Sequence, residues 1–317
     1  MDFLLLTILT FVQLNCENLF DCEHDSLKQD TEYMPWSARR WTRTKYWTKI
    51  RNTASSIASC GADDGKMPDF IALCEIENDS VVRDLARRSQ LRTMRYSYLI
   101  TNSPDPRGID VALLYNPLSF RPLNHYSLHV GQQDEKRPMR DILYVSGLIL
   151  SGDTLHVFVV HASSRYGGTR KSEPRRMATV ERLDEAIDSI RSVSPEAYII
   201  IGGDFNDDSE SKPLRTLWGN GMLDAGRSAN VRASSENTKK IKGTYKYEGK
   251  WESIDHFLVS MPLSGKVSEC FINAPDFLIE KDRKFGGLKP KRSWNGYKFR
   301  KDGFSDHLPL ILRLSFF

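Results

Sequence analysis

The sequence predicts an α/β fold in which mixed β-sheets are covered by helices within one domain spanning residues 1–317. Short apolar runs alternate with helix-like stretches early in the chain, whereas runs joined by turns, typical of hairpins, dominate the middle and the end. The length is sufficient to bury a sizeable core. No repeat, low-complexity linker or break in composition divides the chain.

The apolar N-terminal run predicts a buried first strand over residues 4–14. The run lacks the positively charged start and the small-residue cleavage motif of a secretory signal, and it is too short for a membrane span. The five cysteines form no CxxC pair, which favours a reducing compartment over a zinc site or a disulfide framework. We therefore expect a cytoplasmic protein, with export through the hydrophobic N-terminus as the alternative.

Residues 42–60 are expected to form a helix, because Ile50, Ala54 and Ile57 recur at helical spacing. The run "DFIALCE" at 69–75 predicts a strand. A helix should follow it, capped by Asn78 or Asp79, whose short polar side chains can accept hydrogen bonds from the free N–H groups of a first turn.

The rest of the chain predicts further strands, a long helix and two long loops. Apolar runs predict strands at 109–115, 141–150, 155–161, 197–203, 252–260, 266–272 and 308–316, and helical spacing predicts a helix at 173–192. The "SGDT" between two of these strands has the residues of a hairpin turn. Residues 21–41 and 276–304 are polar, and the second segment carries nine basic side chains among Phe285, Trp294, Tyr297 and Phe299. Segments of this length either contact substrate or are solvated loops.

Polar side chains recur where predicted strands end. They are Asn15, Glu17, Glu75, His161, Asp204, Asn206, Asp255, Asp306 and His307. A carboxylate after one strand usually forms a turn, but so many residues of metal-binding and proton-transferring types predict a site. Carboxylate and amide oxygens suit Mg²⁺ or Mn²⁺, and histidines suit acid–base chemistry near neutral pH.

The stretch "IIIGGDFNDD" illustrates the expected local geometry. Alternate residues of an extended chain share a face, so Asp204 should pair with Asn206, as Asn15 should with Glu17, while Phe205 points into the core. The two glycines leave room for another backbone or a phosphate, and Asp207 and Asp208 are expected to be turn or cap residues. The chain has no Walker-type phosphate loop and no GxSxG motif, so metal-assisted attack of water on a phosphate ester remains.

The succession LNCEN, ALCEIEN, RGIDVALLY, VVHASSRYGG, IIGGDFND, SIDHFLVS and FSDHLPL resembles the endonuclease/exonuclease/phosphatase superfamily, which has the deoxyribonuclease-I-like fold. The resemblance runs from about residue 11 to the C-terminus. It implies a four-layered sandwich of two mixed β-sheets packed face to face, with helices outside and the site at one edge.

The resemblance also implies a metal site for Mg²⁺ or Mn²⁺. Glu75 matches the principal ligand and Asn15 lies beside it, with Glu17 as a second acidic ligand. Asp306 completes a metal position.

For catalysis, the resemblance implies that Asp204 and Asn206 position the attacking water and hold the phosphate. His307 matches the catalytic histidine, and Asp255 matches the carboxylate that orients a histidine. His161 matches the second histidine of the deoxyribonuclease, sphingomyelinase and inositol-phosphatase branches, which argues against the abasic-site endonuclease branch.

Three arginines are candidates for phosphate binding: Arg140, Arg107 and Arg165, with a surface salt bridge as the alternative for each. One departure from the family pattern concerns Val160, which stands where many relatives carry asparagine before the second histidine. This departure affects one substrate or metal contact and leaves the histidine in place. The remaining histidines, His24, His125, His129, His156 and His256, are expected to have only structural hydrogen bonds.

The expected function is metal-dependent hydrolysis of phosphoesters. The net charge of +4 and the basic-aromatic segment favour a nuclease or phosphodiesterase acting on nucleic acid. The alternatives are inositol phosphates, phosphoinositides or sphingomyelin-type headgroups, and a non-catalytic binding module of the same fold. The sequence shows no sign of an obligate protein partner.

Overall fold

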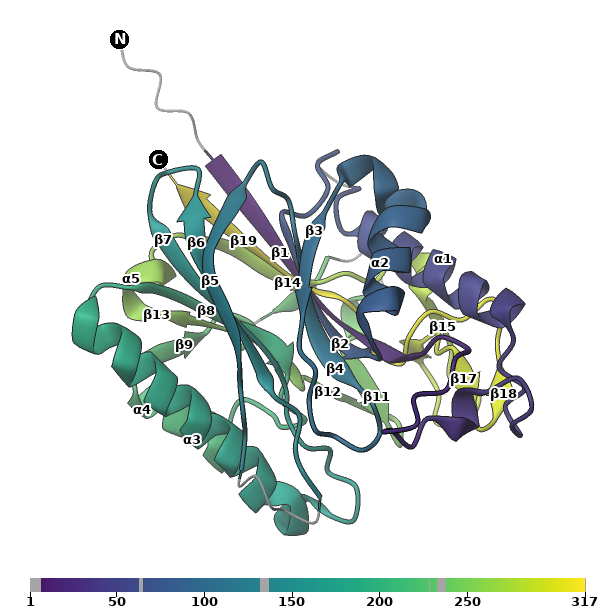
Figure 1. Ribbon diagram of the computed structural model, residues 1–317. Coiled ribbons are helices and arrows are strands. Elements are labelled where there is room, and N and C mark those ends of the chain that lie inside the picture. Colours follow the sequence, from purple (N-terminus) through teal and green to yellow (C-terminus); the bar gives the residue numbers. More distant parts are fainter. Residues whose placement is uncertain (1–6, 63–64, 132–136, 228, 233–237, 317) are drawn as a thin grey trace.

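The computed structural model describes residues 7–62, 65–131, 137–227, 229–232 and 238–316, and within them two β-sheets pack face to face (Figure 1). The first sheet has the spatial order β10 (Asn230–Val231), β14 (Val267–Ile272), β19 (Leu310–Phe316), β1 (Thr7–Leu19), β2 (Phe70–Ile76), β4 (Asp110–Tyr115) and β3 (Ser97–Ile100). The second has the order β5 (Phe120–Leu128), β6 (Ile142–Ile149), β7 (Thr154–His161), β8 (Tyr198–Asp204), β13 (Asp255–Ser260) and β9 (Met222–Asp224).

Both sheets are mixed. In the first sheet β1 pairs with β2 in parallel and with β19 in the antiparallel sense. In the second sheet β7 and β8 are parallel, whereas β13 runs antiparallel to β8. Helices lie on the outer faces, so the predicted four-layered sandwich of two mixed sheets is confirmed (Figure 1).

Three hydrophobic clusters separate the four layers. One cluster lies between the sheets and includes Phe70 of β2 and Phe257 of β13. A second joins the first sheet to α1 (Arg43–Ser59) and α2 (Asp79–Arg88). A third joins the second sheet to α3 (Thr169–Val193) and α4 (Lys212–Gly219). Each sheet therefore has two buried faces, which explains why its central strands read as continuous apolar runs rather than as alternating ones.

The early elements follow the sequence closely. Helix α1 buries Ile50, Ala54 and Ile57, and the Asn78 side chain caps α2 by accepting a hydrogen bond from the Val81 N–H. Strand β1 contains residues 7–14 of the predicted first strand and continues to Leu19, while residues 4–6 lie outside the described part of the chain. No helix within the described residues is both long and apolar enough to cross a membrane.

Helix α3 and strand β5 are two of the elements that differ from the sequence-based expectation. Helix α3 begins at Thr169 rather than near residue 173, so Pro174 is its sixth residue and removes one backbone hydrogen bond from the second turn. Strand β5 was not predicted, because it is the edge strand of its sheet and most of its side chains are exposed and polar. Its sequence therefore has no apolar run to reveal it.

The basic-aromatic segment 276–304 is not an open loop. It contains two small hairpins, β15 (Ile279–Lys281) with β16 (Leu288–Pro290) and β17 (Trp294–Asn295) with β18 (Lys298–Phe299). Trp294 and Phe299 are buried against Trp41, which fixes the segment on the body of the protein. Of the four aromatic residues that the sequence analysis singled out in this segment, only Phe285 and Tyr297 are exposed and could contact a substrate.

The first and last described residues, Thr7 of β1 and Phe316 of β19, are register partners and lie at one edge of the sandwich (Figure 1). The opposite edge carries the end of β1, the loop before β19 and the hairpin of β11 (Tyr245–Tyr247) and β12 (Lys250–Glu252). The polar residues singled out in the sequence lie at this opposite edge.

Candidate active site

The strand register of the second sheet brings three predicted site residues side by side. His161 is the register partner of Asp204 across the parallel pair β7–β8, and Asp204 is the partner of Asp255 across β8–β13. All three are almost completely buried. The ends of three strands therefore place an imidazole and two carboxylates in one row.

The first sheet contributes Asn15 and Glu75. Asn15 pairs in register with Cys74, directly before Glu75. Glu75 has a left-handed backbone (φ 59°) at a register shift between β2 and β4, a bulge that redirects its side chain. The Asn15 Nδ2 donates to Asp204 Oδ2 over 2.9 Å, so a hydrogen bond joins the edges of the two sheets at the site.

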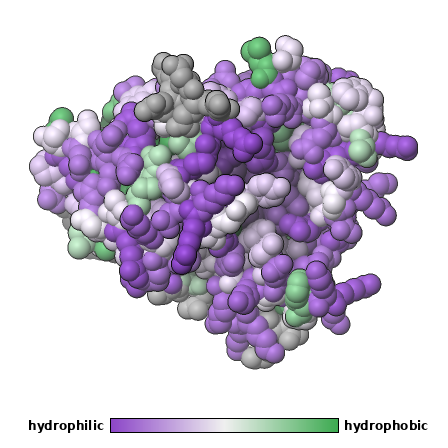
Figure 2. All heavy atoms as spheres, turned by 90° about the horizontal axis from the view of Figure 1, so that it is seen from below, coloured by the Kyte–Doolittle hydropathy of each residue, from purple (hydrophilic) through white to green (hydrophobic). Residues whose placement is uncertain are grey.

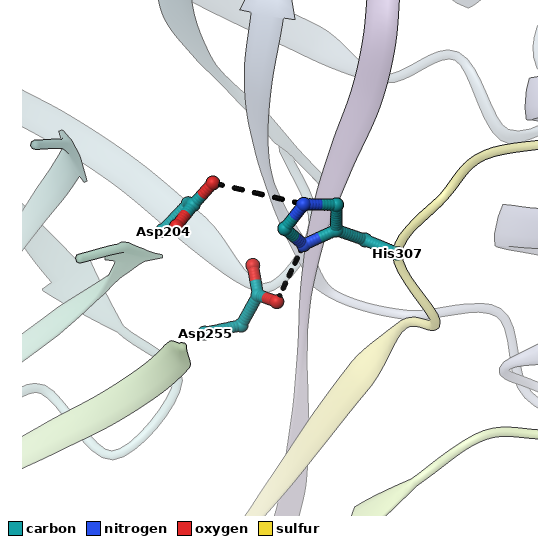
Figure 3. A group of neighbouring side chains, drawn as sticks. All are labelled: Asp204, Asp255 and His307. Carbon is teal, nitrogen blue, oxygen red and sulfur yellow. Dashed lines mark hydrogen bonds and ion pairs between the residues drawn. The ribbon is translucent and has the colours of Figure 1, made fainter. Parts of the chain in front are cut away.

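His307 lies between Asp255 and Asp204 (Figure 3). Its Nδ1 is 2.8 Å from Asp255 Oδ2, and its Nε2 is 3.9 Å from Asp204 Oδ2. Burial alone would lower the pKa of His307, but the charge and hydrogen bond of Asp255 outweigh burial and raise this pKa well above its ordinary value. Asp255 shows the reverse balance, since His307 outweighs burial and lowers the pKa of this carboxyl. The pair is therefore an imidazolium held by a carboxylate.

Asp204 has a pKa raised to about 7, first by burial and then by the negative charge of Asp255. His307 and hydrogen bonds from the Asn15 side chain and the Asn206 N–H oppose this rise. A carboxylate with a pKa near the working pH can accept a proton and release it again, which is what a general base requires.

His161 is the neutral histidine of the site. Burial, followed by the charges of Arg140, Arg107 and His307, lowers its pKa well below the ordinary value. Its Nε2 lies 3.7 Å from Asp204 Oδ2, while its buried Nδ1 has no hydrogen-bond partner among the described residues. The two histidines therefore differ in protonation, because only one of them has a carboxylate partner at hydrogen-bond distance.

In the stretch at residues 199–208, Asp204 and Asn206 line the same cavity, but not through the strand alternation that was predicted. Asn206 has a left-handed backbone (φ 52°), donates its N–H to Asp204 Oδ1 over 2.9 Å, and lines the same cavity as Asp204. Phe205 is buried in the core cluster of the second sheet. At Gly203 a Cβ would overlap the carbonyl of Val160, so close backbone approach rather than phosphate access requires this glycine.

The neighbouring acids have different roles. Asp208 is exposed and accepts a hydrogen bond from the Glu210 N–H, as expected of a turn residue. Asp207 is more than a turn residue, because its carboxylate accepts a hydrogen bond of 2.6 Å from Nε of Arg176 in α3. Its carbonyl accepts from His256, whose other ring nitrogen binds Asp224, so His256 has the structural role predicted for it.

A cavity of about 800 Å³ opens above these residues. Its walls include nine of the predicted residues: Asn15, Glu75, Arg107, His161, Arg165, Asp204, Asn206, Asp306 and His307. Figure 2 views the molecule from this side and shows a hollow rimmed mainly by hydrophilic side chains. The site is thus open to a polar substrate.

Asp255, Arg140 and Glu17 do not line this cavity. Asp255 acts through His307. The buried Arg140 donates to the carbonyl oxygens of His161 and Ala162 and to Asp105, so it supports the end of β7. This geometry does not support the expectation that Arg140 contacts the phosphate.

Glu17 does not share a face with Asn15 as predicted, because its left-handed backbone (φ 51°) interrupts the alternation of the strand. Its carboxylate instead accepts from the backbone N–H groups of Ser293 and Trp294. Asp306 accepts from Arg292 Nη2 over 2.7 Å while lining the cavity. Both acids thus already have hydrogen-bond donors, and their role as metal ligands stays a prediction.

The β11–β12 hairpin adds residues that sequence reasoning missed. Tyr245 forms a β-bridge to His307 and packs against its ring, with centroids 4.9 Å apart. Tyr247 and Glu252 also line the cavity, as does Tyr166 after β7. Glu252 accepts a hydrogen bond from Arg165, across the cavity mouth. The alternation of "TYKY" was the only signal for this hairpin, and it is too short to assign.

The donor set fits a hard divalent cation. Glu75 Oε2 accepts from the Asn18 N–H over 2.8 Å, whereas its Oε1 has no hydrogen-bond donor among the described residues and lies 3.8 Å from the His161 ring nitrogen. Asp204, Asp255 and His307 also lie close enough to one another to hold an ion. Their hydrogen bonds favour a proton-transferring group, whereas Glu75 and Asn15 offer oxygen atoms of the kind that Mg²⁺ and Mn²⁺ prefer.

This fold and site define a phosphoester hydrolase. The chain belongs to the Endonuclease/Exonuclease/phosphatase family, whose model matches residues 10–315. Protein angel of Drosophila melanogaster is 24% identical over 203 residues, which cover 61% of this chain and 55% of that protein. The chain therefore matches only about half the length of this curated relative.

Solved structures share the fold at low sequence identity. Truncated Caenorhabditis elegans TDP2 is 18% identical with a TM-score of 0.58, over 97% of each chain. A mannosyl-6-phosphatase from Bacteroides thetaiotaomicron is 13% identical with a TM-score of 0.59, over 98% of this chain and 100% of the other. Likeness at this level shows the fold and leaves the substrate open.

Proposed function

We propose that this protein is a Mg²⁺- or Mn²⁺-dependent phosphodiesterase that acts on nucleic acid. Glu75 and Asn15 would hold the cation, which supplies polarisation of a phosphoryl oxygen and offsets developing negative charge. The open, hydrophilic cavity above them accommodates a phosphoester with groups on both sides.

In this mechanism Asp204 accepts a proton from the attacking water. Its pKa of about 7 and its place on the cavity wall suit this role. The protonated His307, held by Asp255, stabilises the negative charge of the phosphoryl oxygens through its Nε2. Neutral His161 and the Asn206 amide complete the polar surface around the phosphate.

The observation that carries the choice of nucleic acid is the pair of tyrosines at the cavity mouth. Tyr166 is 95% exposed and Tyr247 is 55% exposed, yet both line the cavity. Arg165 lies directly beside Tyr166 in the chain. Exposed aromatic rings next to an arginine suit bases that stack while a phosphate is bound.

The basic segment 276–304 gives less support than its composition implied. Arg300 pairs with Glu280 at 2.7 Å, and Lys291 pairs with Asp302 at 3.0 Å. Much of its positive charge is therefore neutralised locally. The argument for nucleic acid accordingly rests on the cavity mouth.

A phosphorylated sugar or polyol, such as an inositol phosphate or a lipid headgroup, is the second candidate. The hydrophilic cavity wall favours it, because Asn18, Ser164 and Thr169 offer hydrogen-bonding groups suited to hydroxyls. The structurally similar mannosyl-6-phosphatase is a relative whose name gives a substrate of this chemistry.

A panel of substrates tests these proposals. It includes bis-p-nitrophenyl phosphate, single- and double-stranded DNA, RNA, sphingomyelin and inositol phosphates, each assayed with Mg²⁺ or Mn²⁺. We expect metal-dependent hydrolysis, with an oligonucleotide preferred over the headgroups. Asp204→Ala should lower the rate by about a hundredfold or more, because it removes the general base.

Asp208→Ala is the matched control, since it removes an exposed acid four residues away that lies outside the cavity. Its activity should equal that of the wild type. Near-normal metal-dependent hydrolysis by Asp204→Ala would refute the mechanism. Faster hydrolysis of inositol phosphates than of every polynucleotide would contradict the choice of nucleic acid and support a phosphorylated polyol as the substrate.

A further inference from the structure

Arg292 lies between Glu17 and Asp306, the two acids that the family resemblance assigned to metal binding in addition to Glu75 and Asn15. Its Nη2 donates to Asp306 Oδ2 over 2.7 Å, and its Nε is 3.5 Å from Glu17 Oε1. The three side chains line a second cavity of about 230 Å³, which shares Asn18 and Asp306 with the catalytic cavity. A protein cation therefore already bridges this pair of carboxylates.

Besides its contact with Arg292, the Glu17 carboxylate accepts hydrogen bonds from the protein backbone. Two backbone N–H groups, of Ser293 and Trp294, point at its carboxylate. The fully buried Lys49, whose ammonium donates to the Ser293 hydroxyl over 2.7 Å, adds a second positive charge nearby. A carboxylate with these donors has few lone pairs left for a cation.

Glu75 has the opposite surroundings. One of its oxygens accepts a single backbone hydrogen bond, from Asn18, and the other faces the catalytic cavity. Among the described residues the ring of His161, which is neutral, lies 3.8 Å from Glu75, whereas Lys49 and Arg140 act on Glu75 only at longer range. Glu17 and Asp306 are thus in contact with a protein cation, whereas Glu75 has none at ion-pair distance among the described residues.

We propose that Arg292 takes the place of a second metal ion, so that the protein binds one divalent cation, at Glu75 and Asn15. The guanidinium is permanently charged and fork-shaped, so it can neutralise Glu17 and Asp306 and fix their positions. A divalent ion between the same carboxylates would have to displace it against charge repulsion. Arg292 is in this sense a positioning residue, which keeps Asp306 in place beside His307.

The proposal deepens the proposed function, because it concerns the metal content of the same site. It is tested without substrate, by titrating the metal-free protein with Mn²⁺ and counting bound ions by electron paramagnetic resonance and calorimetry. We expect one ion per chain for the wild type. Arg292→Met, which keeps an unbranched, flexible side chain and removes the charge, should bind two, the second more weakly.

Arg39→Met is the matched control, because Arg39 lines the same small cavity but pairs with Glu32 instead of the two acids. Its stoichiometry should stay at one. If Arg292→Met does not fold, as thermal unfolding would show, Glu17→Gln provides the test. The Mn²⁺ affinity of Glu17→Gln should equal that of the wild type, whereas loss of a true ligand would weaken it about tenfold or more.

Two ions bound by the wild type, or weaker Mn²⁺ binding by Glu17→Gln, would overturn the proposal. The same holds for Arg292→Met if it folds and still binds a single ion. A wild type that binds no Mn²⁺ would contradict the metal-dependent function itself. The failure of this inference and the failure of the proposed function are therefore distinguishable.

Discussion

At the scale of single residues, the site depends on two acids that differ in protonation. Asp255 is stabilised as a carboxylate by His307, with Thr244 and Gln13 as further donors, whereas Asp204 has its pKa raised to about 7. Neighbouring groups with opposite pKa shifts are the usual sign of divided acid and base roles. The strand register creates this division, because it puts the two carboxylates side by side.

This arrangement predicts a bell-shaped dependence of rate on pH. The ionised form of Asp204 is active, so hydrolysis of bis-p-nitrophenyl phosphate should rise about tenfold per pH unit below about 7 and then level off. At higher pH the rate should fall when His307 loses its proton, above the ordinary histidine range. Steady-state rates measured from about pH 5 to about pH 10, on either side of both titrations, check this profile.

The residual activity of Asp204→Asn provides the control for that profile. It should lack the rising limb, because the titrating carboxyl is gone. A rising limb that persists in Asp204→Asn would assign the titration to another group.

At the scale of elements, the pairing of β7 with β8 positions the catalytic row. Gly203 lets the β7 backbone approach at Val160, one residue before the His161–Asp204 register pair. We predict that Gly203→Ala lowers the free energy of unfolding by about 1–3 kcal/mol or more, since the added methyl overlaps a carbonyl that cannot move independently. Urea unfolding measures this change, and hydrolysis should fall with it because Asp204 is displaced.

Gly219→Ala serves as the comparison, since a Cβ at this position at the end of α4 meets no atom within 4 Å. Its effect should stay within about 0.5 kcal/mol. Equal stability of the two variants would show that the strands have room that the structure does not indicate.

The strand ends could be predicted from sequence because residue type and position coincide there. Asp204, Asp255 and His161 each follow or begin an apolar run, and parallel or antiparallel pairing brings such ends to one edge. The direction of Glu17 could not be predicted, because strand alternation does not reveal a left-handed residue. The contact of Asp306 with Arg292 was equally hidden, since Arg292 lies in the short connection between two small hairpins, where the sequence has no periodic pattern.

At the scale of the whole molecule, the net charge of +4 is small and many surface arginines are paired. Two arginines, Arg107 and Arg165, line the catalytic cavity. With about two phosphate contacts, the KM for single-stranded DNA should rise about sevenfold when salt increases about fourfold. The KM for bis-p-nitrophenyl phosphate should change little, since it makes no extended backbone contacts.

Kinetics at constant free Mg²⁺ and two KCl concentrations give the comparison. An equal response of both substrates would contradict recognition of a polynucleotide backbone. A steep response of DNA alone would support it.

The pairing of the first and last strands has a consequence for synthesis. The Ser305 hydroxyl donates to the Asn15 carbonyl across a sequence separation of 290 residues, and His307 follows two positions later. At 5 to 20 residues per second, a ribosome needs about 15 to 60 s to make the chain between them. During that interval the emerging polypeptide lacks His307, so the pair of His307 and Asp255 can form only after the end of the chain has been made.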